Sequence, residues 1–252
     1  MVAWSWLDSG VIFLVGLAAG ALNVLAGGGS FLTLPALIFL GLPPGIANAT
    51  NRVGVLCQNL GAVLEFRRRA VDIPREGLWG IPPALLGSWV GVELALVVSD
   101  SAFQRWLAGF MLALAVWMFF ARQPTVSGRS RSSRGPSLLL FAAGYFAVGL
   151  VGGFIQAGVG FLILALTTAA GLDLVRGNAL KVLLIFLVTI LSLAVFIRYG
   201  RIAWRPGLSL ALGTTIGGLW GVRLTVLKGH EWLRKVVTVT MVLFAIKLWL
   251  EV

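Results

Sequence analysis

The sequence contains few charged residues, and very few of them are acidic. Charged residues make up 12% of the 252 residues, with 9 Asp and Glu against 20 Lys and Arg. A soluble domain carries about a quarter charged residues. Hydrophobic residues reach 59% of this chain. The shortage of charge therefore excludes an ordinary soluble domain and indicates a protein whose solvent is a lipid bilayer.

Cysteine and histidine are almost absent, since the chain has one of each, Cys57 and His230. One cysteine excludes a disulfide within the chain, and no zinc or iron–sulfur ligand set can be built around it. An intramembrane protease needs a nucleophile and a base on neighbouring spans, whereas His230 lies in a predicted loop. A Gly-x-Ser-x-Gly elbow is missing as well, because Phe31 and Leu32 follow Ser30. The sequence therefore predicts no enzyme, no cofactor and no metal site.

Basic residues give the chain a net charge of +11, but they do not form a face for nucleic acid. They occur in short runs between apolar stretches, namely Arg67, Arg68, Arg69 and Arg75, then Arg122, Arg129, Arg131 and Arg134, then Arg198, Arg201 and Arg205. Such runs are typical of membrane loops that face the cytoplasm or anionic headgroups. The first ten residues carry Asp8 and no positive side chain, so we expect no cleavable signal peptide. The expected partner is the lipid bilayer, not nucleic acid.

Apolar segments divide the chain into two halves. The first half contains segments at 10–27, 30–41, 45–65, 77–98 and 103–121, and the second half contains segments at 137–156, 159–171, 177–198, 206–226 and 232–250. A full span needs about 20 residues, so the segments 30–41 and 159–171 are too short and predict half-helices. The polar, basic stretch 122–136 reads as a linker. We expect a first membrane repeat at 1–121 and a second at 137–252.

The two halves resemble each other at a fixed offset of 130 residues. Gly28, Phe31 and Leu32 align with Gly158, Phe161 and Leu162, and Asn48-Ala49 aligns with Asn178-Ala179. The fold class we predict is an all-α integral membrane protein with about 8–10 membrane segments, in which each repeat is a glycine-broken helix hairpin followed by three transmembrane helices. An odd number of crossings per repeat makes the repeats inverted. Loop charges leave a parallel arrangement of four and four spans open.

Glycines mark a break at the same place in each repeat. Gly27, Gly28 and Gly29 precede Ser30, a suitable N-cap for the half-helix that follows. The second copy has Gln156, Gly158 and Gly160 at this place. A helix that begins in mid-membrane presents unpaired N–H groups and about half a positive charge, which favours an anion. The alternative is that the glycines only allow helices to pack closely.

Polar residues follow each break. The first copy has Asn48, Thr50, Asn51 and Arg52, and the second has Asn178 and Lys181. An ionisable group inside a membrane segment is by default a candidate functional residue, and a guanidinium and an ammonium suit an oxyanion. The alternative is that both cations reach the membrane interface. The predicted substrate-binding set is Asn23, Gly27, Gly28, Gly29, Ser30, Asn48, Thr50, Asn51, Arg52, Gln156, Gly158, Gly160, Asn178 and Lys181. Glu93 is a candidate for proton coupling, or else it pairs with an arginine at a helix end.

These residues resemble a known family. The runs Gly20–Pro35, Gly41–Leu42 and Ala47–Thr50, together with Gly149, Gly153, Gly158, Gly160 and Asn178–Lys181, are similar to the two repeats of the TauE/SafE sulfite exporter family. The resemblance implies a multi-pass permease of the bacterial plasma (inner) membrane that exports sulfite or an organosulfonate. Val159 departs from the glycine triplet, so the two breaks need not contact the anion equally. A passive anion channel, a membrane subunit or scaffold of a larger complex, and a homo-oligomer all remain open.

Overall fold

The protein is a bundle of helices. The structure, a computed structural model, describes residues 4–26, 28–73, 75–120, 138–228 and 230–250. The first half forms α1 (Trp6–Ala26), α2 (Ser30–Phe39), α3 (Pro44–Arg68), α4 (Arg75–Leu78), α5 (Ile81–Val97) and α6 (Asp100–Phe120). The second half forms α7 (Leu138–Phe154), α8 (Val159–Ala169), α9 (Leu174–Arg198), α10 (Trp204–Lys228) and α11 (His230–Leu250). The predicted linker 122–136 and Gly27 lie outside the described residues.

The predicted helical segments are confirmed, with two differences. His230, expected in a loop, is the first residue of α11. The segment expected at 77–98 is interrupted at Trp79–Gly80, so the short α4 precedes α5. Prolines at the start of α5 explain the new helix start, because a proline in the first helical turn lacks only an N–H that has no partner there. Gly80 sits directly against the ring of Tyr145, which leaves no room for a side chain at the break.

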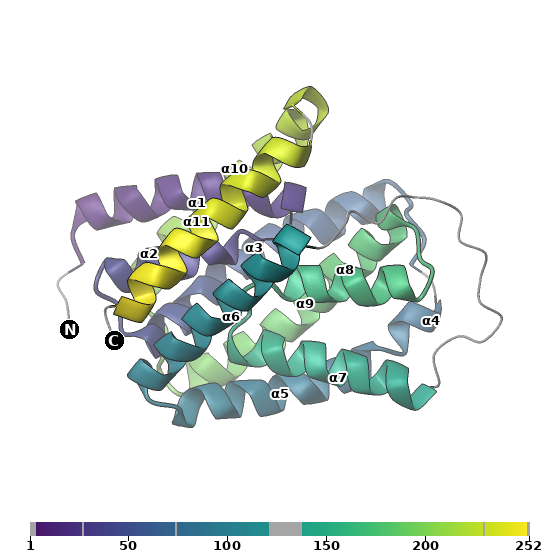
Figure 1. Cartoon of the computed structure of the whole chain (residues 1–252), viewed down its shortest axis with the longest axis horizontal. Coiled ribbons are helices and arrows are strands. Elements are labelled where there is room, and N and C mark those ends of the chain that lie inside the picture. The colour runs from purple at the N-terminus through teal and green to yellow at the C-terminus, as the bar shows by residue number, and fades with distance from the viewer. Residues whose placement is uncertain (1–3, 27, 74, 121–137, 229, 251–252) are drawn as a thin grey trace.

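The two short helices begin inside the bundle and run outward to opposite ends. α2 has ten residues and α8 has eleven, so each is about 15 Å long, half the hydrocarbon thickness. Each follows a long helix, α1 or α7, that enters from the end to which the short helix returns (Figure 1). Their first turns meet in the core, where the rings of Phe31 and Phe161 stack with centroids 6.4 Å apart. The half-helix prediction is thus confirmed in length and position.

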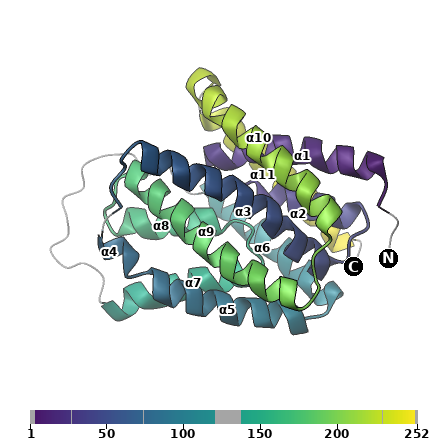
Figure 2. The same ribbon diagram turned by 180° about the vertical axis from the view of Figure 1, so that it is seen from behind.

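Two pairs of long helices pack at backbone distance. α1 packs against α10, and α5 packs against α7; the reverse view shows α10 crossing in front of α1 (Figure 2). Each contact surface has glycines four residues apart, at Gly16 and Gly20, Gly213 and Gly217, Gly87 and Gly91, and Gly149 and Gly153. These are small-xxx-small surfaces, which let membrane helices approach closely. Close packing therefore accounts for these glycines, which lie outside the two breaks.

Close packing gives a prediction about stability. A methyl group at Gly149 would overlap the carbonyl oxygen of Ala84, whereas one at Gly61 would meet nothing within 4 Å. We expect Gly149→Ala to lower the free energy of unfolding by about 2 kcal/mol, since overpacking forces the helices apart. The matched variant Gly61→Ala removes a helical glycine in open space and should not destabilise the protein. Thermal unfolding in detergent measures both, and equal midpoints for the two variants would contradict the prediction.

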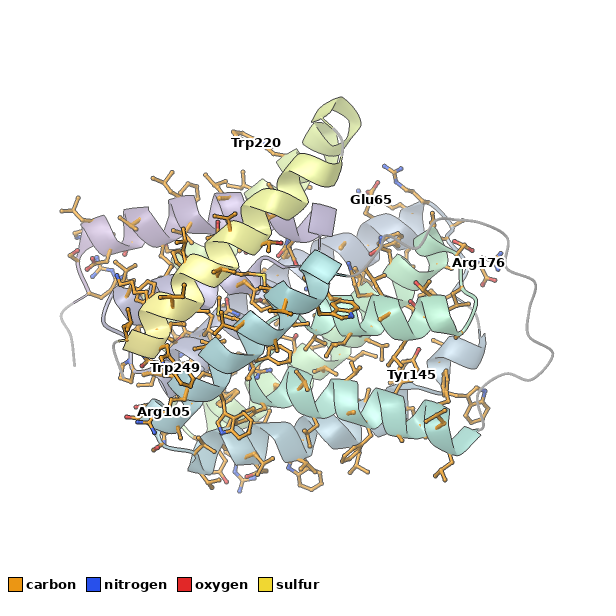
Figure 3. The ribbon with its side chains drawn as sticks, in the orientation of Figure 1. Glu65, Arg105, Tyr145, Arg176, Trp220 and Trp249 are labelled. Carbon is orange, nitrogen blue, oxygen red and sulfur yellow. The ribbon has the colours of Figure 1, made fainter. Side chains whose placement is uncertain are left out.

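The outer surface is apolar along its length and charged at its ends. Large hydrophobic side chains are exposed all around the bundle, including Trp220 and Trp249, while Glu65, Arg176 and Arg105 lie toward its two ends (Figure 3). Two of the described helices have the length and composition of a membrane span, at Trp6–Asn23 and Val175–Arg198, and further apolar helices are shorter. A surface of this kind is what a bilayer covers.

Candidate functional site

Asn48, Asn51 and Arg52 form a buried polar face of α3, since residues three or four positions apart share one side of a helix. Asn48, Thr50, Asn51 and Arg52 are all at most 1% exposed, and Arg52 is among the largest fully buried side chains. α3 begins with Pro44 at its first position, so this polar stretch occupies its second and third turns. Because Arg52 is buried, the alternative in which it reaches the membrane interface is wrong.

Asn51 joins α3 to the first turn of α2. It accepts a hydrogen bond from Thr33 Oγ1 at 2.6 Å and donates one to Ser30 Oγ at 3.3 Å. The predicted N-cap at Ser30 is wrong, since Gly29 holds the cap position and makes no side-chain cap bond. Gly29 is glycine because α2 starts directly against α1, where a Cβ would lie 2.6 Å from the carbonyl oxygen of Ala19.

Asn23 and Gln58 complete the polar contacts of the first break. Asn23 Nδ2 donates to Gln58 Oε1 at 3.0 Å, and Gln58 Nε2 donates to the carbonyl oxygen of Gly20 at 3.0 Å. The backbone N–H of Gly29 points at Asn23 Oδ1, 3.4 Å away. The amides of α1 and α3 therefore tie the end of α1 to the start of α2.

The second break turns through left-handed backbone. Gln156 has φ +64° and Gly158, the N-cap of α8, has φ +74°. Gly158 also lies against the Phe31 ring and Leu114, so only glycine fits both the angle and the space. Gln156 Nε2 donates to Thr189 Oγ1 at 2.7 Å, while Gln156 Oε1 is buried without a partner.

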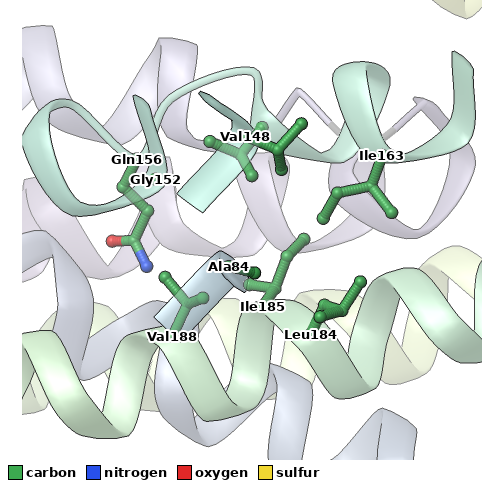
Figure 4. A pocket seen from close by; sticks show the side chains of 9 residues that line it. Ala84, Val148, Gly152, Gln156, Ile163, Leu184, Ile185 and Val188 are labelled. Carbon is green, nitrogen blue, oxygen red and sulfur yellow. The ribbon is translucent and has the colours of Figure 1, made fainter. Parts of the chain in front are cut away.

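A small cavity lies beside the second break. Gln156 and Val159 line it together with Ile163 of α8, and Leu184, Ile185 and Val188 of α9 close the other side (Figure 4). Its lining is almost entirely apolar and it has room for roughly one water molecule.

Arg52 and Asn48 hold the C-terminus of α7. Arg52 Nη1 donates to the carbonyl oxygen of Gly152 at 3.0 Å, and Nη2 donates to that of Gly153. Asn48 Nδ2 donates to the carbonyl oxygen of Phe154 at 2.8 Å. The last carbonyls of a helix lack partners within the helix and carry about half a negative charge, so a buried arginine suits this position. Arg52 Nε and Asn48 Oδ1 remain without partners.

Lys181 lies on α9, one turn before the cavity. Residues three, four and seven positions along a helix share a face, so Lys181 lies on the same face as Leu184, Ile185 and Val188. It is 6% exposed. Among the described residues no hydrogen bond or ion pair engages its ammonium group. Lys181 is thus buried, which makes the interface alternative wrong for this residue as well.

The described carboxylates do not approach these cations. Asp8, Asp100 and Asp173 lie at the starts of helices, and Glu65 pairs with Arg69 at 2.8 Å on the surface. Glu93 is exposed on α5, where it accepts a hydrogen bond from Trp89 Nε1 at 3.2 Å. The structure therefore does not bring Glu93 to the buried cluster or to an arginine. The described residues also contain no group of three or more potential metal ligands.

The other predicted residues are distributed unevenly. Thr50 faces away from the breaks, and its Oγ1 accepts the N–H of Ala203 at 3.0 Å. Gly28 and Gly160 are buried next to the helix starts, and Asn178 is half-buried one turn before Lys181. Sequence reasoning missed Thr33 and Thr189, which bond Asn51 and Gln156. Helical spacing could have found Thr189, since it shares the face of Lys181.

Comparison with known proteins places this architecture in a family. A family model described as "Sulfite exporter TauE/SafE" matches residues 12–248. The "Probable membrane transporter protein" of Haemophilus influenzae is 30% identical over 232 residues, covering 91% of this chain and 89% of that protein. The "Probable membrane transporter protein YfcA" of Escherichia coli (strain K12) is 30% identical over 242 residues, covering 95% and 88%.

A third relative is more distant. The "Probable membrane transporter protein ORF9" of a Sinorhizobium species is 27% identical over 241 residues, covering 94% of this chain and 90% of that protein. No solved structure matches the chain. The matched region includes both helix breaks and nearly all of the membrane helices, so the chain belongs to the TauE/SafE sulfite exporter family of membrane transporters.

Proposed function

We propose that the protein is a permease that exports a small oxyanion, sulfite or an organosulfonate, across the plasma (inner) membrane. The substrate site consists of the N-termini of α2 and α8, the polar face of α3, and Lys181. The observation that carries this proposal is the pair of buried cations, Arg52 and Lys181. None of the described carboxylates pairs with either of them.

Buried charge needs compensation. Moving an ion into a low-dielectric interior costs several kcal/mol of hydration free energy. Interactions with a partner must offset a free energy of about that size. Arg52 is compensated by the C-terminus of α7 and by the face of the Phe196 ring, which lies 5.0 Å from its Cζ atom. Lys181 has no comparable partner among the described residues, so an anion bound at the second break would supply the missing charge.

The proposed repeats are inverted, and the packing of the helices supports this arrangement. At the 130-residue offset α1 corresponds to α7, and α10 corresponds to α5. The two most extensive helix contacts, α1 with α10 and α7 with α5, are equivalent under this correspondence. Phe31 and Phe161, which correspond to each other, stack in the core. An approximate twofold axis between them brings two helix N-termini toward one place from opposite sides.

The test is flux by the isolated protein. Purified protein in liposomes loaded with sulfite should release sulfite well above the rate of empty liposomes, and the release should be inhibited by an excess of a sulfonate. Release from well-folded protein that does not exceed the background would contradict the proposed substrate class. Transport that requires a co-purifying subunit would support the alternative of a subunit in a larger complex.

A further inference from the structure

A second polar region lies at the end of the bundle where α3 and α6 begin and α9 ends. A cavity of about 220 Å³ is present there, between the first turn of α3, the end of α5, the turn into α6, and the connection from α9 to α10. Its lining includes Gly45, Ser99, Asp100, Phe196 and Arg201. The volume is large enough for a four-atom oxyanion with part of its hydration shell.

Arg201 is the residue of this cavity whose charged group has no partner among the described residues. It is exposed, and no hydrogen bond or ion pair engages its guanidinium within the described ranges. The carboxylate of Asp100 is already engaged, since its Oδ1 accepts the N–H of Gly45 at 2.8 Å. Asp100 is also the first residue of α6, so its charge is opposed by the positive ends of two helices. A guanidinium without a partner presents a fork of donors that matches an oxyanion.

Phe196 connects this cavity to the buried cluster. The residue lines the cavity and is only 1% exposed. The guanidinium of Arg52 lies over the same ring, 5.0 Å from its centroid, and Arg52 does not line the cavity. Phe196 therefore borders both the cavity and the first buried cation.

We propose that this cavity is the vestibule through which the oxyanion reaches the buried site, that Arg201 binds it there, and that the Phe196 ring closes the passage toward Arg52. This inference rests on the proposed function, because it assigns a route to the same substrate. It adds a binding residue, Arg201, that lies outside both helix breaks and does not recur at the equivalent position of the other repeat.

The test compares two arginines, one at the end of α9 and one in the connection that follows it. Arg201→Gln should raise the KM for sulfite in proteoliposomes about fivefold, with the maximal rate retained, since an exposed charge-assisted contact is lost before the anion enters. Arg198→Gln is the matched control. It removes the same charge from an exposed position at this end of α9 but does not line the cavity, so the KM should stay unchanged.

A second variant tests the closing ring. Phe196→Leu keeps an apolar side chain and shortens it, so the maximal rate of downhill sulfite flux should rise at least twofold. Equal KM values for wild type and Arg201→Gln, or equal increases in both arginine variants, would overturn the vestibule while leaving the permease function intact. A decrease in maximal rate for Phe196→Leu would overturn the closing role of the ring. Absence of wild-type flux would instead refute the proposed function, and the vestibule with it.

Discussion

Replacing Lys181 with methionine is expected to reduce sulfite flux at least a hundredfold and, at the same time, to raise the thermal stability of the protein. Lys181 is 6% exposed, and no carboxylate approaches it in the described parts of the chain. Methionine has a similar volume and no charge, so it removes a buried cation that the empty protein does not compensate. The loss of flux follows because the anion then enters a site that has lost the buried cation without a partner among the described residues. Losing one partner of a buried charge pair costs about 2–5 kcal/mol.

Flux is expected to fall while thermal stability rises, and these opposite directions make the prediction specific. A residue that only supports the fold would lose flux and stability together. Lys181→Arg should keep most of the flux, because it preserves the charge. Lys247→Met is the matched control, since Lys247 is exposed on α11 and its ammonium lies 4.0 Å from the ring of Phe39. Flux that survives in Lys181→Met, measured in proteoliposomes alongside unfolding in detergent, would remove Lys181 from the site.

The architecture was predictable because segment length and glycine position are local properties. The dozen-residue segments had to be half-helices, and α2 and α8 confirm this. The glycine break before α8 was likewise visible, although the left-handed conformation of Gln156 was not. The predicted Ser30 cap was wrong because nothing in the local sequence indicates that Asn51, from another helix, engages the serine hydroxyl. Capping rules consider the residues of one helix, whereas this hydrogen bond joins two helices.

The partners of the buried residues were not predictable, because they are distant in sequence and belong to the backbone. Arg52 bonds carbonyl groups of Gly152 and Gly153, and any residue type would present the same carbonyls. The sequence therefore identified Arg52 as a candidate anion ligand without showing that two of its donors are already engaged. Thr50 was included in the predicted site because it is adjacent to the other polar residues in sequence. Its Oγ1 instead accepts a hydrogen bond from the N–H of Ala203 at the end of the bundle.

These contacts separate the roles of the two buried cations. Arg52 joins the first half of the chain to the end of α7 and so holds the second break in place, whereas Lys181 is available to a ligand. We expect Arg52→Ala to lower the free energy of unfolding by about 3 kcal/mol, because the buried carbonyls of Gly152 and Gly153 lose their donors and a cavity forms beside Phe196. The unfolding midpoint in detergent should fall by about 5–10 °C.

Arg67→Ala is the control for this change, since Arg67 lies in the last turn of the same helix and a surface substitution shifts stability by only about 0.5 kcal/mol. Arg52→Lys should recover part of the stability, because an ammonium can reach one carbonyl but cannot bridge two. Its sulfite flux should show an unchanged KM with a lower maximal rate if Arg52 acts through the position of α7. A raised KM in a variant of normal stability would show instead that Arg52 contacts the anion directly, and the division of roles between Arg52 and Lys181 would then be wrong.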